Sequence, residues 1–290
     1  MKEILKILFF ISFSLSTAKG ISQEVINIKY IANEGFLIES NNKKILFDGL
    51  FGGFEATWCD VPLPETKFKL EYSEPPFDNI DIIFISHKHS DHFNADMVVN
   101  HSLSNHNCKI ICPIQVQESL SNHSNYEQIK KNVIAFSPDL SKDTLFIIDD
   151  MKVKIYRLEH SPYYEKNTIT GEKINRHQSI ENLGFLVDIG GIRLFHCGDA
   201  NPWNEKEFQN LNLEQDSIDI AFLERLFFIN NKGIEVIKNN IKPKKIVLMH
   251  IAPNNQEKYK MVLKELGDNF LDVYMFEELM DNRSFSINEF

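Results

Sequence analysis

The sequence is poor in cysteine and has fewer basic than acidic side chains. Four cysteines in 290 residues are too few to build a disulfide-stabilised scaffold, and a chain of this length does not need one. Lysine and arginine number 31 against 41 aspartate and glutamate residues, which gives a formal charge of -10. Proteins that bind bulk nucleic acid or anionic membranes normally carry the opposite charge. We therefore expect a small-molecule substrate, and the sequence leaves the oligomeric state open.

Long apolar runs, repeats and low-complexity tracts are also missing after residue 20. A membrane-spanning helix needs about 20 apolar residues, and no stretch in this part of the chain approaches that length. Hydrophobic residues make up 43% and charged residues 25% of the chain, an ordinary globular composition that excludes wholesale disorder. Because no Ser/Gly-rich linker divides the chain, we predict one domain over residues 21–290.

Residues 1–20 form a separate segment. Lys2 and Lys6 precede the apolar run Ile7–Leu15, and small residues follow that run. This order is typical of a secretory signal peptide, and the run is too short to cross a bilayer. We predict that residues 1–20 are a signal peptide and that the protein is exported, to the periplasm or beyond, without a stable membrane anchor. A buried amino-terminal strand or helix is the alternative.

Apolar runs of strand length alternate with segments of helical period. The predicted strands are Val25–Ile31, Phe36–Glu39, Lys44–Phe47, Ile80–Ile85, Lys109–Cys112, Val133–Ala135, Val153–Leu158, Leu183–Asp188, Ile192–His196, Ile218–Leu223, Lys245–Met249 and Asp272–Met275. The predicted helices are Ala95–Leu103, Gln115–Ser121, Glu205–Leu211, Gly233–Asn240 and Gln256–Leu266. Some strands form hairpins, as at Gly190-Gly191, and others alternate with helices, so we predict an α/β protein with mixed sheets. The proline-containing segment Gly49–Asp78 has no clear period and is predicted to be a long loop.

The strongest chemical signal is the sequence SHKHSDH, which begins at Ser86. It places three imidazoles and one carboxylate within six positions, directly after an apolar predicted strand. Imidazole and carboxylate are good ligands for zinc and similar divalent ions. On an extended turn, His87 and His89 point the same way, whereas Asp91 and His92 aim at a neighbouring point. This spacing favours two adjacent ions over one; a histidine-rich surface loop is the alternative.

Three more predicted strands end in a side chain that can bind a metal ion. One strand is followed by Glu159-His160, another by Cys197-Gly198-Asp199 and a third by His250. Sites in α/β proteins assemble from loops at the carboxyl ends of strands. A single histidine or aspartate in such a place is weak evidence, so the argument depends on the joint order of all four motifs.

In this order of motifs the chain resembles the metallo-β-lactamase superfamily, specifically its metal-dependent hydrolases similar to the ascorbate-phosphate lactonases. The matching segments are Ile45–Gly49, His87–His92, Leu158–Ser161, Gly191–Ala200 and Lys242–His250. The resemblance implies an α/β fold, a four-layer αββα sandwich of two mixed β-sheets flanked by helices. It also implies two divalent metal ions at one edge of the sandwich. Zinc is the default ion for imidazole and carboxylate ligands, and iron or manganese would also fit.

The resemblance also assigns the metal ligands. One ion would be held by His87, His89 and His160, and the second by Asp91, His92 and His250, with Asp199 as the bridge. His177 and His196 compete with His160 for the third-histidine position. His160 is preferred because it ends a strand, and because strand alternation turns His196 away from Asp199.

The implied reaction is hydrolysis of a small ester, lactone or phosphodiester. Asp91 is the predicted catalytic residue, because it can orient water or relay a proton while it binds the second ion. Asp48 follows an early strand and is expected to hydrogen-bond a ligand imidazole; starting a turn is its alternative role. Arg176 and His177 are candidates for the substrate pocket, with a solvated loop as the alternative.

Three other functions compete with hydrolysis of a small molecule. A nuclease similar to the RNA-processing members would carry a large insert between Asp199 and His250, where this chain has a short connection. A di-iron redox protein of the superfamily would replace a cluster histidine by glutamate and add a flavin domain, and neither is seen. A catalytically inactive metal-binding or ligand-sensing protein would usually have lost a ligand, whereas here every ligand position is filled.

Overall fold

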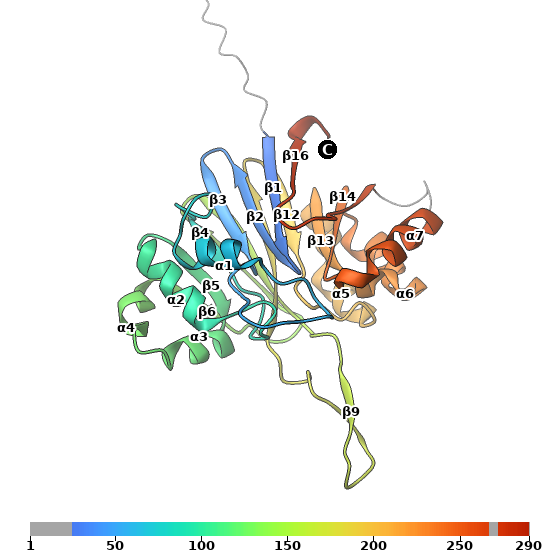
Figure 1. Cartoon of the computed structure of the whole chain (residues 1–290). Coiled ribbons are helices and arrows are strands. Elements are labelled where there is room, and N and C mark those ends of the chain that lie inside the picture. The colour runs from blue at the N-terminus through green and yellow to red at the C-terminus, as the bar shows by residue number, and fades with distance from the viewer. Residues whose placement is uncertain (1–24, 267–271, 290) are drawn as a thin grey trace, which may run out of the picture.

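Two seven-stranded sheets form the centre of the molecule, and a two-stranded hairpin projects from it (Figure 1). The computed structural model describes residues 25–266 and 272–289, so the predicted signal peptide at residues 1–20 lies outside the described residues. None of the helices within the described ranges combines the length with the apolar character that a membrane span requires.

The first sheet combines antiparallel and parallel strands in the order β16-β1-β2-β3-β4-β5-β6. Strands β3 to β6 run parallel, and the remaining neighbours are antiparallel. The strands of this sheet are β1 (Val25–Ala32), β2 (Gly35–Ser40), β3 (Lys43–Phe47), β4 (Ile82–Phe84), β5 (Lys109–Pro113), β6 (Val133–Phe136) and β16 (Asn282–Ser286).

The second sheet is also mixed and has the order β15-β14-β13-β12-β11-β8-β7. Strands β12 to β15 run parallel, whereas β7, β8, β11 and β12 are successively antiparallel. Gly190 and Gly191 both have positive φ, 62° and 77°, and form the predicted tight turn between β11 and β12. The strands are β7 (Asp143–Ile148), β8 (Met151–Leu158), β11 (Asn182–Ile189), β12 (Ile192–His196), β13 (Ile220–Glu224), β14 (Lys245–Met249) and β15 (Asp272–Met275).

Helices cover the outer face of each sheet, which completes the predicted αββα sandwich (Figure 1). The first sheet carries α1 (Pro64–Glu71), α2 (Ala95–Ser104), α3 (Ile114–Ser121) and α4 (Tyr126–Ile129). The second carries α5 (Glu205–Leu211), α6 (Asn231–Val236), which continues as the π-helix Ile237–Ile241, and α7 (Gln256–Leu266). Short 3-10 helices lie at Lys130–Asn132, Leu213–Asp216, Arg225–Phe228, Pro253–Asn255 and Ile287–Glu289.

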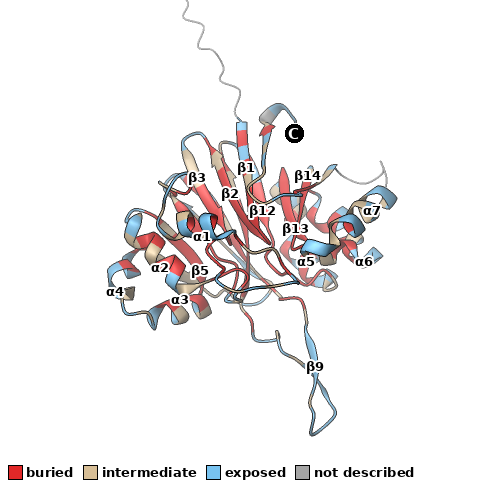
Figure 2. Ribbon diagram, viewed as in Figure 1, coloured by how far each residue is buried: buried red, intermediate tan, exposed pale blue. Residues whose placement is uncertain are grey.

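Strand alternation divides the apolar side chains between two cores. In β3, Ile45 and Phe47 belong to the core between the two sheets, whereas Leu46 packs on the opposite face with Leu70 of α1 and Met97 of α2. The sheets are accordingly buried on both faces, while the hairpin is exposed (Figure 2). The central strands are therefore held by packing on both sides, which gives the strand ends fixed positions.

The prediction that Gly49–Asp78 is entirely loop was wrong, because it contains α1. Pro64 at its start fixes a helical φ, and the pairs Glu65–Lys69 and Lys67–Glu71 support it along its length. Only Thr66 and Leu70 of this helix are buried, so no apolar stripe marks it in the sequence. The signal that was missed is the spacing of oppositely charged side chains four residues apart, and not a hydrophobic period.

The strands that were not predicted lack a two-sided apolar pattern. The hairpin strands β9 (Tyr164–Lys166) and β10 (Lys173–Asn175) are largely exposed, β16 buries only Phe285, and β7 is an edge strand with alternate exposure. The twelve predicted strands all occur, with ends shifted by at most two residues. All of the central strands were thus visible in the sequence, whereas two of the four edge strands, β7 and β16, and the exposed hairpin were not.

Candidate metal centre

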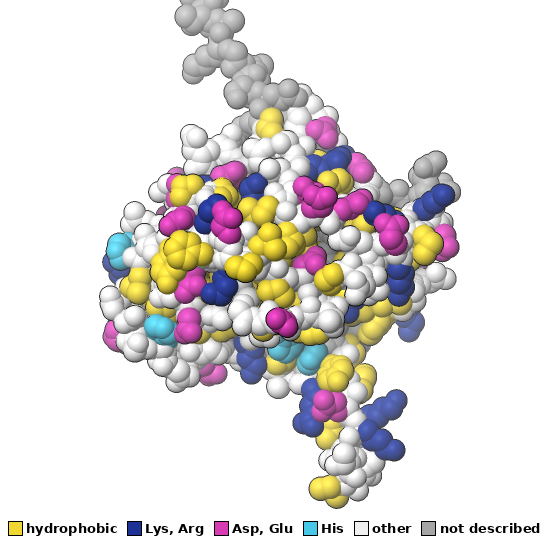
Figure 3. All heavy atoms as spheres, in the orientation of Figure 1, with side chains coloured by type: hydrophobic (Ala, Val, Ile, Leu, Met, Phe, Trp, Pro, Cys, Tyr) yellow, Lys and Arg dark blue, Asp and Glu magenta, His cyan; other side chains and the backbone are white. Residues whose placement is uncertain are grey.

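The carboxyl ends of several parallel strands meet at one edge of the sandwich. The segment after β4 contains the histidine-rich cluster, His160 follows β8, Asp199 follows β12 and His250 follows β14. In Figure 3, histidine side chains gather at this edge, beside the root of the projecting hairpin. The sheet topology therefore brings together residues that are far apart in the sequence.

The first donor group consists of three imidazoles and one carboxylate. His87 Nε2 lies 3.0 Å from His89 Nδ1, and His160 Nε2 lies 3.3 Å and 3.2 Å from these two atoms. Asp199 Oδ2 is 3.4 Å from His160 Nε2 and 3.8 Å from His87 Nε2. Two nitrogens that bind one tetrahedral ion at about 2.0–2.1 Å are separated by about 3.3 Å. The group therefore has the dimensions of a metal-binding shell.

The second donor group lies on the other side of Asp199. His92 Nε2 and His250 Nε2 are 3.3 Å and 3.4 Å from Asp91 Oδ2, and 3.4 Å and 3.5 Å from Asp199 Oδ1. Each oxygen of Asp199 thus faces a different donor group. His92 Nε2 and Asp199 Oδ1 are buried and have no hydrogen-bond partner, although they face each other. A cation between these two atoms would satisfy both, so the residues present fit a metal ion.

Neighbouring groups fix the orientation of the second donor group. Asp48 accepts a hydrogen bond from Ser86 N at 2.7 Å and another from the Ser86 hydroxyl, and its Oδ2 is 2.9 Å from His92 Nδ1. This arrangement is the one expected when Asp48 orients a ligand imidazole. Asn33 Nδ2 donates to Asp91 Oδ2 at 3.1 Å and to the Asp91 carbonyl oxygen at 3.2 Å, which holds that carboxylate in place.

Backbone contacts hold the other ligands. His160 forms an isolated antiparallel bridge with Ala200, and Ser161 N donates to the Asp199 carbonyl oxygen at 2.7 Å. The backbone at Gly198 has φ of 55°, and a Cβ there would lie 2.3 Å from Asn182 Oδ1. Only glycine therefore fits before Asp199. Arg225 Nη1 donates to the His250 carbonyl oxygen at 3.0 Å and lies 2.7 Å from His250 Nδ1.

Burial keeps the imidazoles of the first group neutral. Burial, followed by the neighbouring histidines, lowers the pKa of His87 well below its usual value. Burial likewise lowers the pKa of His89 to about 4, and it lowers that of His160. A neutral imidazole is the form that offers a lone pair to a metal ion. The group is therefore ready to bind a cation at neutral pH.

The carboxylates between the groups are ionised, although they are buried. Burial alone would raise the pKa of Asp199, but His250, His92 and His160 lower it to about 2. Burial also acts to raise the pKa of Asp91, and His92 and His250 hold it well below the usual range. The pKa of His92 is raised well above its usual value by Asp91 and Asp199, despite its burial. Strongly shifted pKa values of this kind are common at functional sites.

The remaining predicted residues divide into those inside and those outside the cluster. His177 lies beside it, with its ring centroid 4.7 Å from that of His89 and 4.4 Å from that of His160. Arg176 is exposed and pairs with Glu165 of the hairpin at 2.7 Å, so the structure does not place it in the cluster. His196 is buried in the sheet and stacks on Phe47, as strand alternation predicted. All four cysteines are buried and free.

Sequence reasoning missed three charged residues beside the centre: Glu34, Glu224 and Arg225. Glu34 lies in the turn between β1 and β2, and Glu224 ends β13 directly before Arg225. Glu224 and Arg225 follow the rule used for the predicted ligands, a polar side chain at the carboxyl end of a strand, and that rule could have found them. Glu34 comes from an antiparallel turn, and its Asn-Glu-Gly sequence resembles that of any tight turn.

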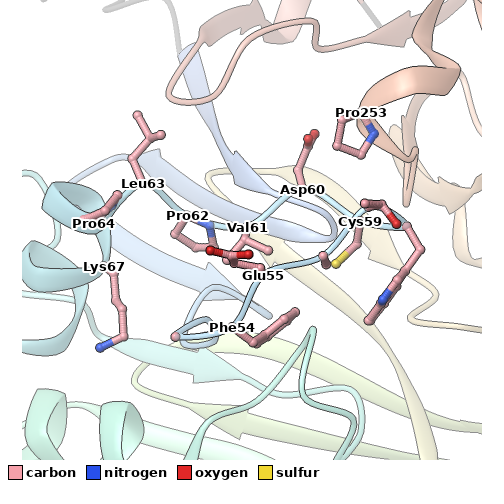
Figure 4. Close-up of a pocket in the computed structure, with 14 residues that line it drawn as sticks. Phe54, Glu55, Cys59, Asp60, Val61, Pro62, Leu63, Pro64, Lys67 and Pro253 are labelled. Atoms are coloured by element: carbon pink, nitrogen blue, oxygen red, sulfur yellow. The ribbon is translucent and has the colours of Figure 1, made fainter.

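A pocket of about 1050 Å³ lies along the loop before α1 and is shown in Figure 4. The loop before α1 forms most of its wall, and Pro253, three residues after His250, closes one end. Lys67 lies at the opposite end from Cys59 (Figure 4). Burial, followed by the charge of Asp91, raises the pKa of Cys59 to about 12, so this part of the loop is close to the donor groups. Trp58 is half exposed in the wall and stacks on Phe54.

Comparison with known proteins identifies the family. The model of the beta-lactamase superfamily domain matches residues 35–258. The chain belongs to this superfamily, and the resemblance to the superfamily that its histidine and aspartate motifs indicated is confirmed.

Solved structures share the fold at low identity. Igni18, a metallo hydrolase from Ignicoccus hospitalis, is 16% identical with a TM-score of 0.56, covering 90% of this chain and 98% of the other. CmlA, a diiron β-hydroxylase from Streptomyces venezuelae, is 12% identical with a TM-score of 0.58, covering 91% of this chain and 54% of the other. The endoribonuclease YSH1 of Kluyveromyces lactis is 24% identical over 161 residues, which are 54% of this chain and 21% of that protein. These proteins differ in reaction, so the fold alone does not assign one to this chain.

Proposed function

We propose that this protein is a hydrolase that binds two divalent metal ions and cleaves an ester, lactone or phosphodiester bond of a small molecule. His87, His89 and His160 would hold one ion, Asp91, His92 and His250 the other, and Asp199 would bridge them. The main observation that supports this proposal is that the two oxygens of Asp199 face two separate donor groups. Zinc suits the imidazole-rich first group, and iron or manganese is compatible with the set.

The charge balance around the centre supports this proposal. The buried carboxyl groups beside the donor groups belong to Glu34, Asp48, Asp91, Asp199 and Glu224. Burying carboxylates is strongly unfavourable unless cations compensate them. The positive partners recorded for them among the described residues include His92 and His250, which act on Asp91 and Asp199, and Arg225, which acts on Glu224. Divalent cations would balance the excess of negative charge.

The side chains have separate tasks in the proposed reaction. Bound divalent cations supply Lewis acidity and lower the pKa of water to near neutrality. Asp91, fixed by Asn33, is positioned to orient the attacking water or to relay its proton. Asp48 holds His92 through Nδ1, which leaves Nε2 for the centre. The loop that carries Trp58 and Cys59 would limit access of bulk water and contact the substrate.

The pocket supports a small-molecule substrate. Its wall combines apolar groups such as Trp58 and Phe54 with charged groups such as Glu55, Asp60 and Lys67. Pockets of 300–1,000 Å³ with a few polar groups are typical of small-ligand sites, and this one is of that order. A net charge of -10 opposes binding of a polyanion.

Hydrolysis of one generic phosphodiester and one generic lactone by the full chain tests the proposed function. Asp199→Asn should reduce turnover at least about 100-fold, because it removes the charge shared by both donor groups. Asp150→Asn is the matched control, since Asp150 is an exposed turn residue on which asparagine is equally well accommodated. Equal turnover in both variants would refute the assigned centre.

The match to YSH1 favours a second candidate function, cleavage of RNA. That match covers only part of each chain, and the acidic charge of this protein opposes it. An unstructured RNA added to the same assay separates the two candidates. RNA cleavage that disappears in Asp199→Asn, without turnover of either small substrate, would favour the nuclease.

A further inference from the structure

Glu34 is a buried carboxylate without a hydrogen-bond partner. It lies in the turn between β1 and β2, its exposed fraction is 0%, and neither Oε1 nor Oε2 has a partner. The turn itself is well fixed, because the Glu34 carbonyl oxygen is 3.0 Å from His196 Nε2. Gly35 is packed just as closely, since a Cβ there would lie 3.1 Å from the Asp48 carbonyl oxygen. The side chain is therefore held beside the centre by a rigid backbone.

The groups around Glu34 do not compensate its charge. Its neighbours include the carboxylates of Asp199, Asp48 and Glu224. The one positive partner recorded for it within residues 25–266 and 272–289 is His92, whose Nδ1 is 3.7 Å away and already bonded to Asp48. A proton on Glu34 would remove the charge but would still need an acceptor, and neither oxygen of Glu34 has a partner at hydrogen-bond distance. A buried polar group in this state calls for an additional partner.

Glu34 converges with residues of the second donor group. One oxygen of Glu34, one of Asp199 and one nitrogen of His250 all lie within 4.8 Å of one another. Glu34 forms a further set of this kind with Asp48 and His92. It is thus close to donor atoms of two of the four side chains that surround the proposed second ion, Asp199 and His250, and its recorded contact with His92 is to the outer nitrogen, Nδ1.

We propose that Glu34 is an additional ligand of the second cation, which makes this site selective for a harder ion than the first. The inference rests on the proposed two-ion centre. The first site would offer three imidazoles and one carboxylate, a donor set suited to tetrahedral zinc. With Glu34, the second site would offer two imidazoles and three carboxylates. Oxygen-rich sets with more donors suit manganese or ferrous iron, so the protein would hold two different metals.

Competitive metal binding to the full chain tests this inference. The apoprotein is loaded with one equivalent of Zn²⁺ and titrated with Mn²⁺, and free Mn²⁺ is followed by electron paramagnetic resonance. We expect the wild-type chain to take up one Mn²⁺ beside the Zn²⁺. Glu34→Gln should keep the Zn²⁺ and lose at least about tenfold in Mn²⁺ affinity, the size of effect found when a metal site loses a supporting group.

Glu224→Gln is the matched control. Glu224 is as deeply buried and is also influenced by the charge of Asp199, but it belongs to none of the donor sets among the described residues. The Mn²⁺ affinity of the Glu224→Gln variant should stay within about threefold of wild type. Equal losses in both variants would mean that Glu34 acts through its charge alone, and would overturn its role as a ligand.

The remaining outcomes separate this inference from the proposed function. If wild type binds both ions and Glu34→Gln does so with unchanged affinity, the inference fails and the two-ion centre stands. If wild type binds no second ion, both fail. Should Glu34→Gln not fold, anomalous diffraction from Mn²⁺-loaded wild-type crystals decides. A manganese peak within about 2.6 Å of a Glu34 oxygen supports the inference, and a peak beyond about 4 Å overturns it.

Discussion

Four residues at the centre have left-handed backbone conformations. Asn33, Asp48, Gly198 and His250 have φ values of 51°, 36°, 55° and 58°, and each closely follows a strand. A residue other than glycine loses about 1–2 kcal/mol in this conformation. The packed sheets compensate that loss, and the sharp turns place side chains directly at the strand ends. Strain of this kind is a recognised feature of functional sites.

Gly198→Ala should lower the free energy of unfolding by about 2–4 kcal/mol, from the left-handed conformation together with the overlap with Asn182. Gly171→Ala is the control, because its φ is 76° but its nearest heavy atom to an added Cβ is 3.8 Å away. The free energy of unfolding of that variant should fall by only about 1 kcal/mol. Urea denaturation of both variants measures the difference, and equal losses would contradict the packing argument.

Asp48→Asn should weaken metal binding about 10- to 100-fold with little change in fold. The amide keeps the size of the side chain, but it removes the negative charge that faces His92 Nδ1. Metal affinity measured with a competing chelator checks the expectation. Wild-type affinity in this variant would show that Asp48 has only the turn-forming role that the sequence left open.

At the scale of elements, α5 supports the segment that follows β8 and contains His160. Glu207 of α5 accepts hydrogen bonds from Glu159 N with both carboxylate oxygens, at 3.0 Å and 3.1 Å, and Asn204 Nδ2 donates to Glu159 Oε2 at 2.6 Å. Burial raises the pKa of Glu207 to about 7. A helix on the outer face of the sheet thus contributes to positioning a proposed ligand.

This raised pKa predicts a pH dependence of stability. The native state binds the Glu207 proton more tightly than the unfolded state does, so this contribution is complete below about pH 4.5 and is lost as the pH rises to about 7. In wild type, the free energy of unfolding should therefore decline between about pH 4.5 and pH 7. Glu207→Gln should make this decline smaller by about 1–3 kcal/mol. Glu205→Gln, on the same helix but exposed, should leave the decline as in wild type. Chemical denaturation at pH 5, 6 and 7 compares them, and parallel curves for all three proteins would contradict the assignment.

The strands that the sequence indicated most clearly are those packed on two faces. Strands such as β4 and β14 are continuous apolar runs, so their position could be predicted, and with it the edge where the ligands lie. Helix α1 could not be predicted from hydrophobic period, because it buries only two side chains. The loop before α1 contributes the pocket, and its path depends on contacts such as that of Tyr30 Oη with Asp60 at 2.8 Å, which link distant segments.

At the scale of the whole molecule, the centre joins both sheets. Asp48 and the histidine-rich cluster follow strands of the first sheet, whereas His160, Asp199 and His250 follow strands of the second. The motifs were readable because each follows its own strand. The role proposed for Glu34 could not be predicted from the sequence. Its need for a further positive partner becomes visible only when the surrounding carboxylates are seen together.

Removal of metal should therefore loosen the contact between the sheets. A chelator should lower the melting temperature, and the loss should reverse when Zn²⁺ is restored. A ligand at about 1,000 times its dissociation constant stabilises a protein by about 4 kcal/mol. Thermal unfolding with and without chelator measures the shift, and Asp199→Asn should show little response. A wild-type melting temperature that does not depend on metal would contradict a structural contribution from the ions.

The metal content of the purified, metal-replete full chain tests the central claim most directly. Elemental analysis should find two divalent ions per wild-type chain and a clear loss in Asp199→Asn, whose side chain faces both donor groups. Fewer than one ion per wild-type chain would contradict the two-ion centre and the reaction proposed for it.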